Sequence, residues 1–482
     1  MFSTKSDLAD DVPLHDTKVR CRLKAKFATV FHGAIRRIKV SFTRRQILSA
    51  TTSQVGIALA QRAFAANDNI QIALIGAGGM GQGDAGMASS IPDVKLVAAC
   101  DIYDDRLQRA KELWGDNIFT TRDYREVLIR KDIDAVIIGT PDHWHSRISI
   151  DAMNAGKDVY CEKPMVHKIP QGPEVVEAQK RTGRILQVGS QYASSPVFQR
   201  ARELMNAGAI GELNMVEAWL DRDTALGAWQ YSIPPNASPE NIDWDRFLGY
   251  APKRPFEPIR LFRWRNYNDY GTGLAGDLYV HLLTGLHVVT GSLGPNRIYG
   301  TGGTRFWKDG RDAPDVMLAL LDYPKQATHP EFNLNLRVNF ASGEPQELFG
   351  LRFYGSEGTM EATMNKLTLS HVPRETEPGY TLGAFSKKTQ EEILKQYREK
   401  YPDNKAARVL KADKVEAFEA PRSPSAHQIH HNNFYQAVRT RRAFFEDAVF
   451  GYRTAGPAVL CNTSVYERRI CHWDPVNLVE IA

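Results

Sequence analysis

The stretch Ile72-Ala-Leu-Ile-Gly-Ala-Gly-Gly-Met-Gly81 joins an apolar run to a turn rich in glycine. The run 70–75 has the composition of a buried strand, and the residues after the glycines are compatible with a helix. In a G-x-G-x-x-G turn the first glycine permits the tight bend, the second lets backbone amides approach a diphosphate, and the third lets the helix pack close to the strand. The N-terminus of that helix presents unpaired N–H groups to the phosphates. We therefore predict that a dinucleotide binds here, at Gly76, Gly78, Gly79, Met80 and Gly81.

A second apolar run, Val94–Cys100, ends at Asp101, which follows Gly81 by 20 residues. An acidic side chain at this distance accepts hydrogen bonds from the hydroxyls of the adenosine ribose. It also repels a 2′-phosphate. The sequence therefore favours NAD over NADP as the cofactor.

Apolar strands alternate with amphipathic helical stretches as far as about residue 190. The alternation predicts an α/β fold with a doubly wound parallel sheet, in which ligands bind at the carboxyl ends of the strands. The expected strands are 70–75, 94–100, 134–139, 158–161 and 185–189, and the expected helices are 103–114, 121–131 and 146–155.

The pattern changes after residue 190, where strands follow one another with few helices between them. This predicts a second, α+β domain with an open, largely antiparallel sheet. Its expected strands are 213–221, 297–303, 315–323, 332–341, 348–355 and 367–371, with helical stretches at about 274–291 and 429–469 and a strand-like tail. Residues 373–427 are a polar insertion with a helix at 387–400, and we interpret them as a surface element rather than a substrate lid. The predicted domains are 1–65, 66–190 and 191–482.

The net charge of +5 over 482 residues comes from the N-terminal segment. Residues 1–65 contain 12 Lys or Arg and 4 Asp or Glu, so they carry +8 and the rest of the chain carries −3. The basic balance is therefore no argument for nucleic-acid binding. The five cysteines have neither CxxC nor metal-ligand spacing, and we interpret them as packed thiols.

Residues 1–65 have the layout of an export signal. Arg44-Arg45 precedes a moderately apolar stretch, 47–60, and Ala63-Phe64-Ala65 has the small-residue pattern of a cleavage site. The segment Ser41–Ile47 resembles a twin-arginine signal, whose pathway exports folded proteins. The sequence predicts a periplasmic or exported protein without stable membrane association after cleavage; the alternative is a disordered basic tail.

Two further segments follow predicted strands at their carboxyl ends: Thr140-Pro-Asp-His-Trp-His145 and Glu162-Lys163-Pro164. Together with the glycine-rich turn, they resemble the Gfo/Idh/MocA oxidoreductases, the family of glucose–fructose oxidoreductase and inositol dehydrogenase. The resemblance covers residues 70–482, including Trp473-Asp-Pro475. It implies that Lys163 contacts both substrate and cofactor, although a plain ion pair with Glu162 is the alternative. It also implies cofactor contacts for Thr140, Pro141, His143, His145, Glu162 and Gln191.

Asp277 and His281 are four residues apart in Gly271-Thr-Gly-Leu-Ala-Gly-Asp-Leu-Tyr-Val-His281, so a helix places them on one face. This segment resembles the catalytic helix of the family. The resemblance implies His281 as general base, Lys163 as hydrogen-bonding or proton-relaying partner, and Asp277 as the residue that orients both. The alternative is a satisfied Asp–His pair in the core.

Other polar and aromatic residues give weaker indications. Arg265 and Tyr270, just before the catalytic glycines, are candidate substrate contacts together with Asp277 and His281. His143 and His145 lack an apparent third ligand, and the histidines at 427, 430 and 431 more plausibly open the last helical region, so no metal site is predicted.

The leading hypothesis is an NAD(P)-dependent oxidoreductase that acts on a hydroxyl of a sugar, polyol or glycoside, with tightly bound cofactor. One alternative is a redox-neutral glycosidase or epimerase that uses NAD for transient oxidation. A cofactor-holding protein without turnover is a third. The resemblance also implies a homo-oligomer, either a dimer or a tetramer.

Overall fold

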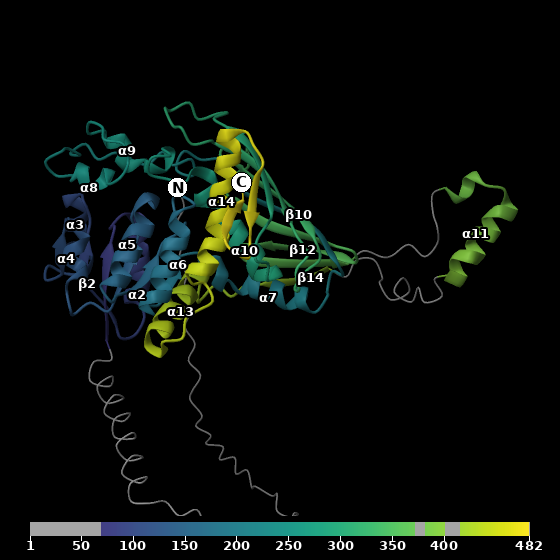
Figure 1. Ribbon diagram of the computed structural model, residues 1–482, viewed down its shortest axis with the longest axis horizontal. Coiled ribbons are helices and arrows are strands. Elements are labelled where there is room, and N and C mark those ends of the chain that lie inside the picture. Colours follow the sequence, from purple (N-terminus) through teal and green to yellow (C-terminus); the bar gives the residue numbers. More distant parts are fainter. Residues whose placement is uncertain (1–68, 372–380, 401–414, 482) are drawn as a thin grey trace, which may run out of the picture. The chain divides into compact units, whose positions relative to one another are not determined.

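The computed structural model describes residues 69–371, 381–400 and 415–481 of a compact unit that spans residues 67–482 (Figure 1). The predicted export signal and Cys21 lie outside the described residues, as do residues 372–380 and 401–414 of the predicted insertion. Of the described part, no helix is long and apolar enough to cross a membrane.

The first sheet is parallel and doubly wound, as the alternating pattern predicts. Its six strands lie in the order β3-β2-β1-β4-β5-β6, so the chain reverses direction of winding between β1 and β4. A ligand crevice forms at such a reversal, outside the carboxyl ends of the strands. The strands are β1 (Ile70–Ile75), β2 (Val94–Cys100), β3 (Phe119–Thr121), β4 (Ala135–Ile138), β5 (Asp158–Cys161) and β6 (Leu186–Val188).

Helices cover both faces of this sheet; two of the predicted helices have other bounds, and the helices at 171–182 and 196–206 were not predicted. The predicted helix 121–131 is only five residues long. The strand β3, which the prediction missed, ends at Thr121, and Asp123 caps the N-terminus of the helix that follows. The predicted helix 146–155 begins earlier, directly after Pro141. The helices are α2 (Gly79–Ser89), α3 (Asp104–Trp114), α4 (Tyr124–Leu128), α5 (Asp142–Asn154) and α6 (Gln171–Thr182), followed by a 3₁₀ turn (Gln191–Ser194) and α7 (Pro196–Asn206).

The second sheet has ten strands, and all of its neighbours but one pair are antiparallel. The exception is β7 beside β10, because β7 inserts between β10 and β11. The order is β14-β13-β12-β11-β7-β10-β9-β8-β15-β16, and the prediction missed the short strands β12 and β14. The bounds are β7 (Leu213–Asp221), β8 (Arg297–Gly303), β9 (Val316–Tyr323), β10 (Phe332–Asn339), β11 (Leu348–Gly355), β12 (Gly358–Thr363), β13 (Lys366–His371), β14 (Val415–Glu419), β15 (Cys471–Asp474) and β16 (Val479–Ile481).

One face of the second sheet packs against α7, α10 (Val280–Thr290) and α14 (Ala448–Glu467). Side chains along β9 point alternately to the two faces of the sheet, and Leu318 and Leu320 are exposed on the opposite face. The long helix α14 also contacts α6, and α13 (Ala426–Thr440) packs on α2 (Figure 1). The last helices therefore tie the two sheets together. The insertion contributes α11 (Lys387–Lys400), as predicted, with a 3₁₀ turn (Leu382–Ala384) before it.

Helix α10 is buried along its whole length and is preceded by a π-helical turn, Ala275–Tyr279. Such turns occur mostly as single insertions in longer helices, often at functional sites. Close packing explains the small residues here, because a Cβ on Gly276 would lie 2.0 Å from Thr272 Oγ1 and one on Gly285 would lie 2.9 Å from the Phe198 ring. The predicted helix 274–291 is thus confirmed, and Asp277 lies within its π-helical turn.

Burial in α10 lowers the pKa of His287 to about 3, although its Nε2 lies 3.0 Å from the Tyr323 hydroxyl. Between that value and the ordinary 6.5, the unfolded chain binds a proton that the folded chain does not, so stability falls as the pH drops. The wild type and His287→Leu are compared at pH 7 and pH 5. We expect the free energy of unfolding to fall over this range by roughly 2 kcal/mol less in His287→Leu than in the wild type. Urea titrations at the two pH values measure this difference, with exposed His472→Gln as control; equal losses in His287→Leu and wild type would contradict it.

Candidate active site

The glycine-rich turn lies between β1 and α2 in a conformation that larger residues cannot adopt. Gly76 has φ +93°, and a Cβ on it would lie 2.6 Å from the carbonyl carbon of Gly139. A Cβ on Gly81 would lie 2.1 Å from Gly76 O. The turn and the first residues of α2 therefore pack directly against the backbone that leaves β4.

A cleft of about 540 Å³ opens at this turn, within the size range of ligand sites. It is lined by ten of the predicted site residues from the first sheet: Gly76, Gly78, Gly79, Met80, Asp101, Thr140, Pro141, His145, Glu162 and Lys163. Two of them have buried oxygens, Thr140 Oγ1 and Glu162 Oε1, without a hydrogen-bond partner in the described part of the chain. Size, glycine cradle and spare polar atoms all fit a dinucleotide.

Asp101, at the end of β2, joins the glycine-rich turn to the loop that follows β2. Its Oδ2 accepts a hydrogen bond from Ala77 N at 2.8 Å, and its Oδ1 accepts one from Tyr103 N at 3.0 Å. Arg106 Nη1 lies 3.5 Å from Oδ2. Because a carboxylate has about four acceptor positions, it can still accept from a ribose hydroxyl.

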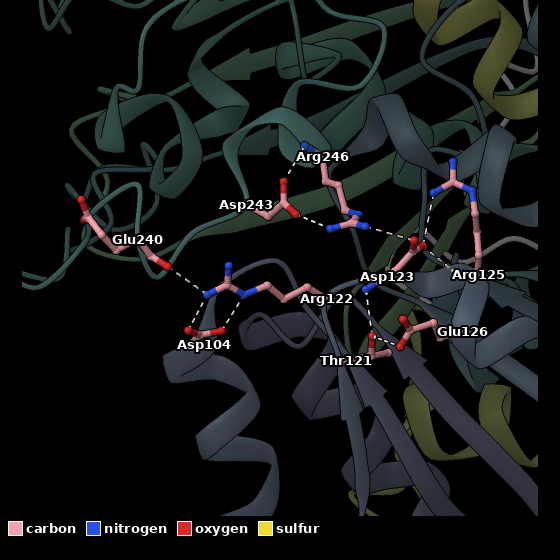
Figure 2. A network of polar contacts seen from close by, with 9 residues as sticks. All are labelled: Asp104, Thr121, Arg122, Asp123, Arg125, Glu126, Glu240, Asp243 and Arg246. Carbon is pink, nitrogen blue, oxygen red and sulfur yellow. Dashed lines mark hydrogen bonds and ion pairs between the residues drawn. The ribbon is translucent and has the colours of Figure 1, made fainter.

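Besides Arg106, three arginines line the cleft on this side, and each is paired with a carboxylate (Figure 2). Arg122 donates to Asp104 through Nε at 2.7 Å and to Glu240 O at 3.1 Å. The other two share Asp123: Arg125 at 3.2 Å and Arg246 at 3.1 Å, with Arg246 also bound to Asp243. The hydrogen bond from Arg122 lowers the pKa of Asp104. These cations are therefore already compensated within the chain.

Residues 229–270, here called the covering segment, close one side of the cleft. The segment contains α8 (Trp244–Leu248), α9 (Pro258–Phe262) and a 3₁₀ turn (Trp264–Asn266). Ile242 forms a β-bridge with Tyr103, whose ring packs edge-on against Phe262 at 5.5 Å. Arg246 of the segment pairs with Asp123, and Arg122 donates to the backbone oxygen of Glu240, so the loop after β3 is bound to the segment (Figure 2). Its residues in the cleft lining are Tyr231, Ser232, Arg246, Phe247, Leu261, Phe262, Trp264 and Arg265.

Lys163, at the end of β5, meets Asp277 from the π-turn at one end of the cleft. Its Nζ donates to Asp277 Oδ1 at 2.8 Å and to the backbone oxygen of Asp277 at 3.0 Å. Arg265 Nε donates to the same Oδ1 at 3.1 Å. Burial raises the pKa of Asp277, but the positive charges of Lys163 and Arg265 outweigh it and hold that pKa far below its usual range. Asp277 is therefore ionised and fixes both cations.

His281 lies one helical turn beyond Asp277 and is buried. Burial, with a further contribution from the Lys163 charge, lowers the pKa of His281 well below 6.5. The imidazole is therefore neutral at physiological pH and able to accept a proton. Its Nδ1 has no hydrogen-bond partner among the described residues, and the Tyr192 ring packs edge-on against it at 5.1 Å.

The structure places five of the predicted site residues away from the cleft lining. Two are Asp277 and His281, and the other three are His143, Tyr270 and Gln191. His143 is fully buried, with Nε2 2.8 Å from Phe247 O, and burial lowers its pKa to about 3. Tyr270 is also fully buried and packs against Phe247. Gln191 lies in the 3₁₀ turn before α7, outside the cleft lining. His143 and Tyr270 thus hold the covering segment to the end of β4, as the hydrogen bond from His143 N to Tyr270 O shows.

Sequence reasoning missed residues that connect the site to its surroundings. Asp142 Oδ2 accepts hydrogen bonds from Thr272 N at 2.9 Å and from Thr272 Oγ1 at 2.6 Å, which links the end of β4 to the catalytic segment. His145 makes a similar link, with ring nitrogens 2.8 Å from the backbone oxygens of Thr140 and Pro164. Asp142 lies within the motif 140–145, and its place directly before two histidines was a signal that could have identified it.

The histidines at the start of α13 belong to a buried polar cluster behind Lys163. His431 Nε2 lies 3.2 Å from Asp84 Oδ1, and the His431 ring stacks on Tyr160 at 4.3 Å. Burial raises the pKa of Asp84 and also that of Glu162. In residues 69–371, 381–400 and 415–481, no group of three or more His, Cys, Asp or Glu is arranged to hold a metal ion.

Residues 70–190 match the model of the GFO_IDH_MocA oxidoreductase family, NAD-binding Rossmann fold. The chain is 30% identical over 131 residues to inositol 2-dehydrogenase of Salmonella typhimurium, which is 27% of this chain and 39% of that protein. It is 33% identical over 144 residues to scyllo-inositol 2-dehydrogenase (NAD(+)) of Bacillus subtilis, which is 30% of this chain and 42% of that protein. The chain thus spans less than half the length of these relatives.

Solved structures resemble a larger part of the chain at lower identity. Levoglucosan dehydrogenase in complex with NADH and levoglucosan matches with a TM-score of 0.59 and 18% identity, over 86% of this chain and 99% of that one. The WlbA dehydrogenase of Bordetella pertussis, in complex with NADH and UDP-GlcNAcA, matches with a TM-score of 0.59 and 17% identity, over 84% and 99%. At such identity the likeness establishes the two-sheet fold alone. Residues 70–190 therefore resemble the NAD-binding Rossmann domain of the Gfo/Idh/MocA oxidoreductase family.

Proposed function

We propose that this protein is an NAD-dependent oxidoreductase that acts on a hydroxyl of a sugar, polyol or glycoside. The observation that carries the proposal is that Lys163, which lines the dinucleotide cleft, is paired with Asp277 at 2.8 Å and lowers the pKa of the buried His281 through its charge. The named relatives that are inositol dehydrogenases, and the levoglucosan dehydrogenase of similar fold, support the carbohydrate class.

The roles of the three residues follow from their charges. The cofactor, when bound, supplies the acceptor or donor of the hydride at the carbon that bears the hydroxyl. Neutral His281 takes the hydroxyl proton, since its lowered pKa keeps it free of a proton at neutral pH. Lys163 donates a hydrogen bond to the reacting oxygen, and Asp277 fixes Lys163 in place through its 2.8 Å contact.

The cofactor we propose is NAD rather than NADP. A 2′-phosphate needs cations that are free to bind it. Arg122, Arg125 and Arg246 are each engaged with carboxylates (Figure 2), and Arg106 is paired with Asp101 itself at 3.5 Å. Asp101 adds a negative charge where the ribose hydroxyls bind.

We further propose that the cofactor stays bound between turnovers. The covering segment is tied to the first sheet by Tyr103, Arg122 and Arg246, so release of a dinucleotide requires several contacts to break together. A resident cofactor suits the twin-arginine signal proposed for residues 1–65, because that pathway exports folded proteins. The exposed leucines of β9 on the uncovered face of the second sheet support a proposed homo-oligomer.

The test uses purified protein without added NAD. We expect absorbance of the reduced-nicotinamide band to grow when a single oxidisable carbohydrate is added and to disappear again when a carbonyl acceptor follows. Absence of any band change with a broad panel of sugars and polyols, in protein that demonstrably contains NAD, would refute oxidoreduction. Hydrolysis of a glycoside without net band change would indicate the redox-neutral route instead.

A further inference from the structure

Arg265 is held in a fixed position at the catalytic end of the cleft. Its guanidinium lies over the Trp264 ring, 4.2 Å from the ring centroid, and its Nε donates to Asp277 Oδ1 at 3.1 Å. The side chain is 22% exposed and lines the cleft. Stacking on one side and the carboxylate on the other orient the guanidinium plane.

Its two terminal nitrogens are left for another partner. In the described part of the chain, the hydrogen bonds and ion pairs of Arg265 are confined to Asp277, through Nε. A guanidinium has five N–H donors in a planar fork, so four donors remain on the terminal nitrogens. Two parallel N–H groups of such a fork match the oxygens of a carboxylate or a phosphate.

Lys163 and Arg265 share one carboxylate at this end of the cleft, that of Asp277. The neighbouring acids Glu162 and Asp84 do not supply a second negative charge, because burial raises the pKa of each and favours its neutral form. Arg222, whose charge also reaches Asp277, is paired with Glu347 at 2.5 Å. The charge of Asp142 also reaches Arg265, but Asp142 Oδ2 accepts from Thr272, and in the described part of the chain Arg265 is paired with Asp277 alone.

We propose that the substrate is an anionic carbohydrate, a sugar acid or sugar phosphate, whose charged group is bound by the fork of Arg265. Lys163 and Arg265 share one oxygen of Asp277, so the anionic group belongs to the same sugar residue as the reacting hydroxyl. This inference rests on the proposed oxidoreductase function and specifies its substrate class. It makes Arg265 a specificity-determining residue in addition to its contact with Asp277.

The first experiment compares sugars that differ only in charge. D-glucuronate and glucose 6-phosphate are tested against D-glucose, and D-galacturonate against D-galactose, in full-length protein with its cofactor. Two quantities are measured: kcat/KM for hydride transfer, and the affinity of the NADH-reduced protein for each sugar by calorimetry. A charge-assisted bidentate contact is expected to favour an anionic sugar over its neutral counterpart by about 10- to 100-fold in both.

Variants show whether Arg265 causes the preference. Arg265→Gln removes the charge and the fork, and we expect it to reduce the anionic-to-neutral ratio to near unity. Arg265→Lys keeps the charge but loses the planar fork, and we expect an intermediate ratio. Arg260→Lys is the matched control, because Arg260 lies on the same segment but outside the cleft lining and binds Glu257. Its ratio is expected to equal that of the wild type.

The outcomes separate this inference from the proposed function. Oxidation of neutral sugars with equal or better kcat/KM leaves the oxidoreductase proposal standing and overturns the anionic substrate. Binding of uronates that depends on Arg265, without oxidation of any sugar, supports the anionic ligand and overturns the oxidoreductase proposal. If Arg265→Gln weakens NADH binding and leaves the sugar ratio unchanged, the fork binds the cofactor diphosphate and the inference is wrong.

Discussion

Replacement of Lys163 by methionine is expected to slow hydride transfer by about 10²- to 10⁴-fold, the range for loss of a group that assists proton transfer. Methionine has a similar length but cannot donate a hydrogen bond to the reacting oxygen. Asp277 would lose the Nζ contact at 2.8 Å but keep Arg265, so the π-turn is expected to remain in place. Single-turnover reduction of the bound nicotinamide measures the effect directly.

The matched control is Lys95→Met, which removes an exposed lysine from β2. We expect both variants to retain as much NAD as the wild type after purification, because neither residue holds the glycine-rich turn. A Lys163→Met variant with the hydride-transfer rate of the wild type would remove Lys163 from the catalytic group. Loss of bound NAD in that variant would show instead that the lysine acts chiefly on the cofactor.

The second large effect is expected from a single methyl group at Gly81. A Cβ there would lie 2.1 Å from Gly76 O and 3.1 Å from the Leu74 side chain, and neither the strand nor the turn has room to yield. Gly81→Ala is expected to displace the turn, abolish measurable NADH binding and lower the free energy of unfolding by about 1 to 3 kcal/mol. Fluorescence titration with NADH and urea unfolding measure the two effects.

Gly83→Ala is the control for this substitution, because Gly83 lies in the same helix with nothing within 4 Å of an added Cβ. There an alanine is expected to stabilise the protein by about 0.5 to 1 kcal/mol and to leave NADH binding intact. Equal NADH affinity in Gly81→Ala and Gly83→Ala would mean that the turn does not bind the dinucleotide.

Local sequence patterns were sufficient for most of the first sheet. β1 and β2 have the predicted bounds, because mostly buried parallel strands are largely apolar runs that can be recognised without tertiary information. The three-residue strand β3 has no such run and was missed. In the second sheet, β8 and β11 also match, while β12, with its glycine and threonines, is defined by its neighbours rather than by its own composition.

The candidate site was predictable where function depends on a motif and not where it depends on packing. Lys163, Asp277 and Asp101 stand where the motifs placed them. Tyr270 and His143 carry the same kinds of side chain as substrate and cofactor contacts, yet both are buried against Phe247. Exposure is a property of the assembled fold, and residue type alone does not determine it.

By itself, the sequence determined that a dinucleotide turn is followed by a parallel sheet and that Asp101 and Lys163 stand at the ends of its strands. Glycines in a fixed pattern and apolar runs determine structure over short distances along the chain, so they can be recognised in the sequence alone. The tertiary structure alone decided that Asp277 serves two cations, that the covering segment closes the cleft, and that Arg265 keeps free donors. Lys163 and Asp277 are 114 residues apart in the chain, and Arg265 and Asp277 are 12 apart. Which charges pair is therefore determined only when the folded chain brings these side chains together.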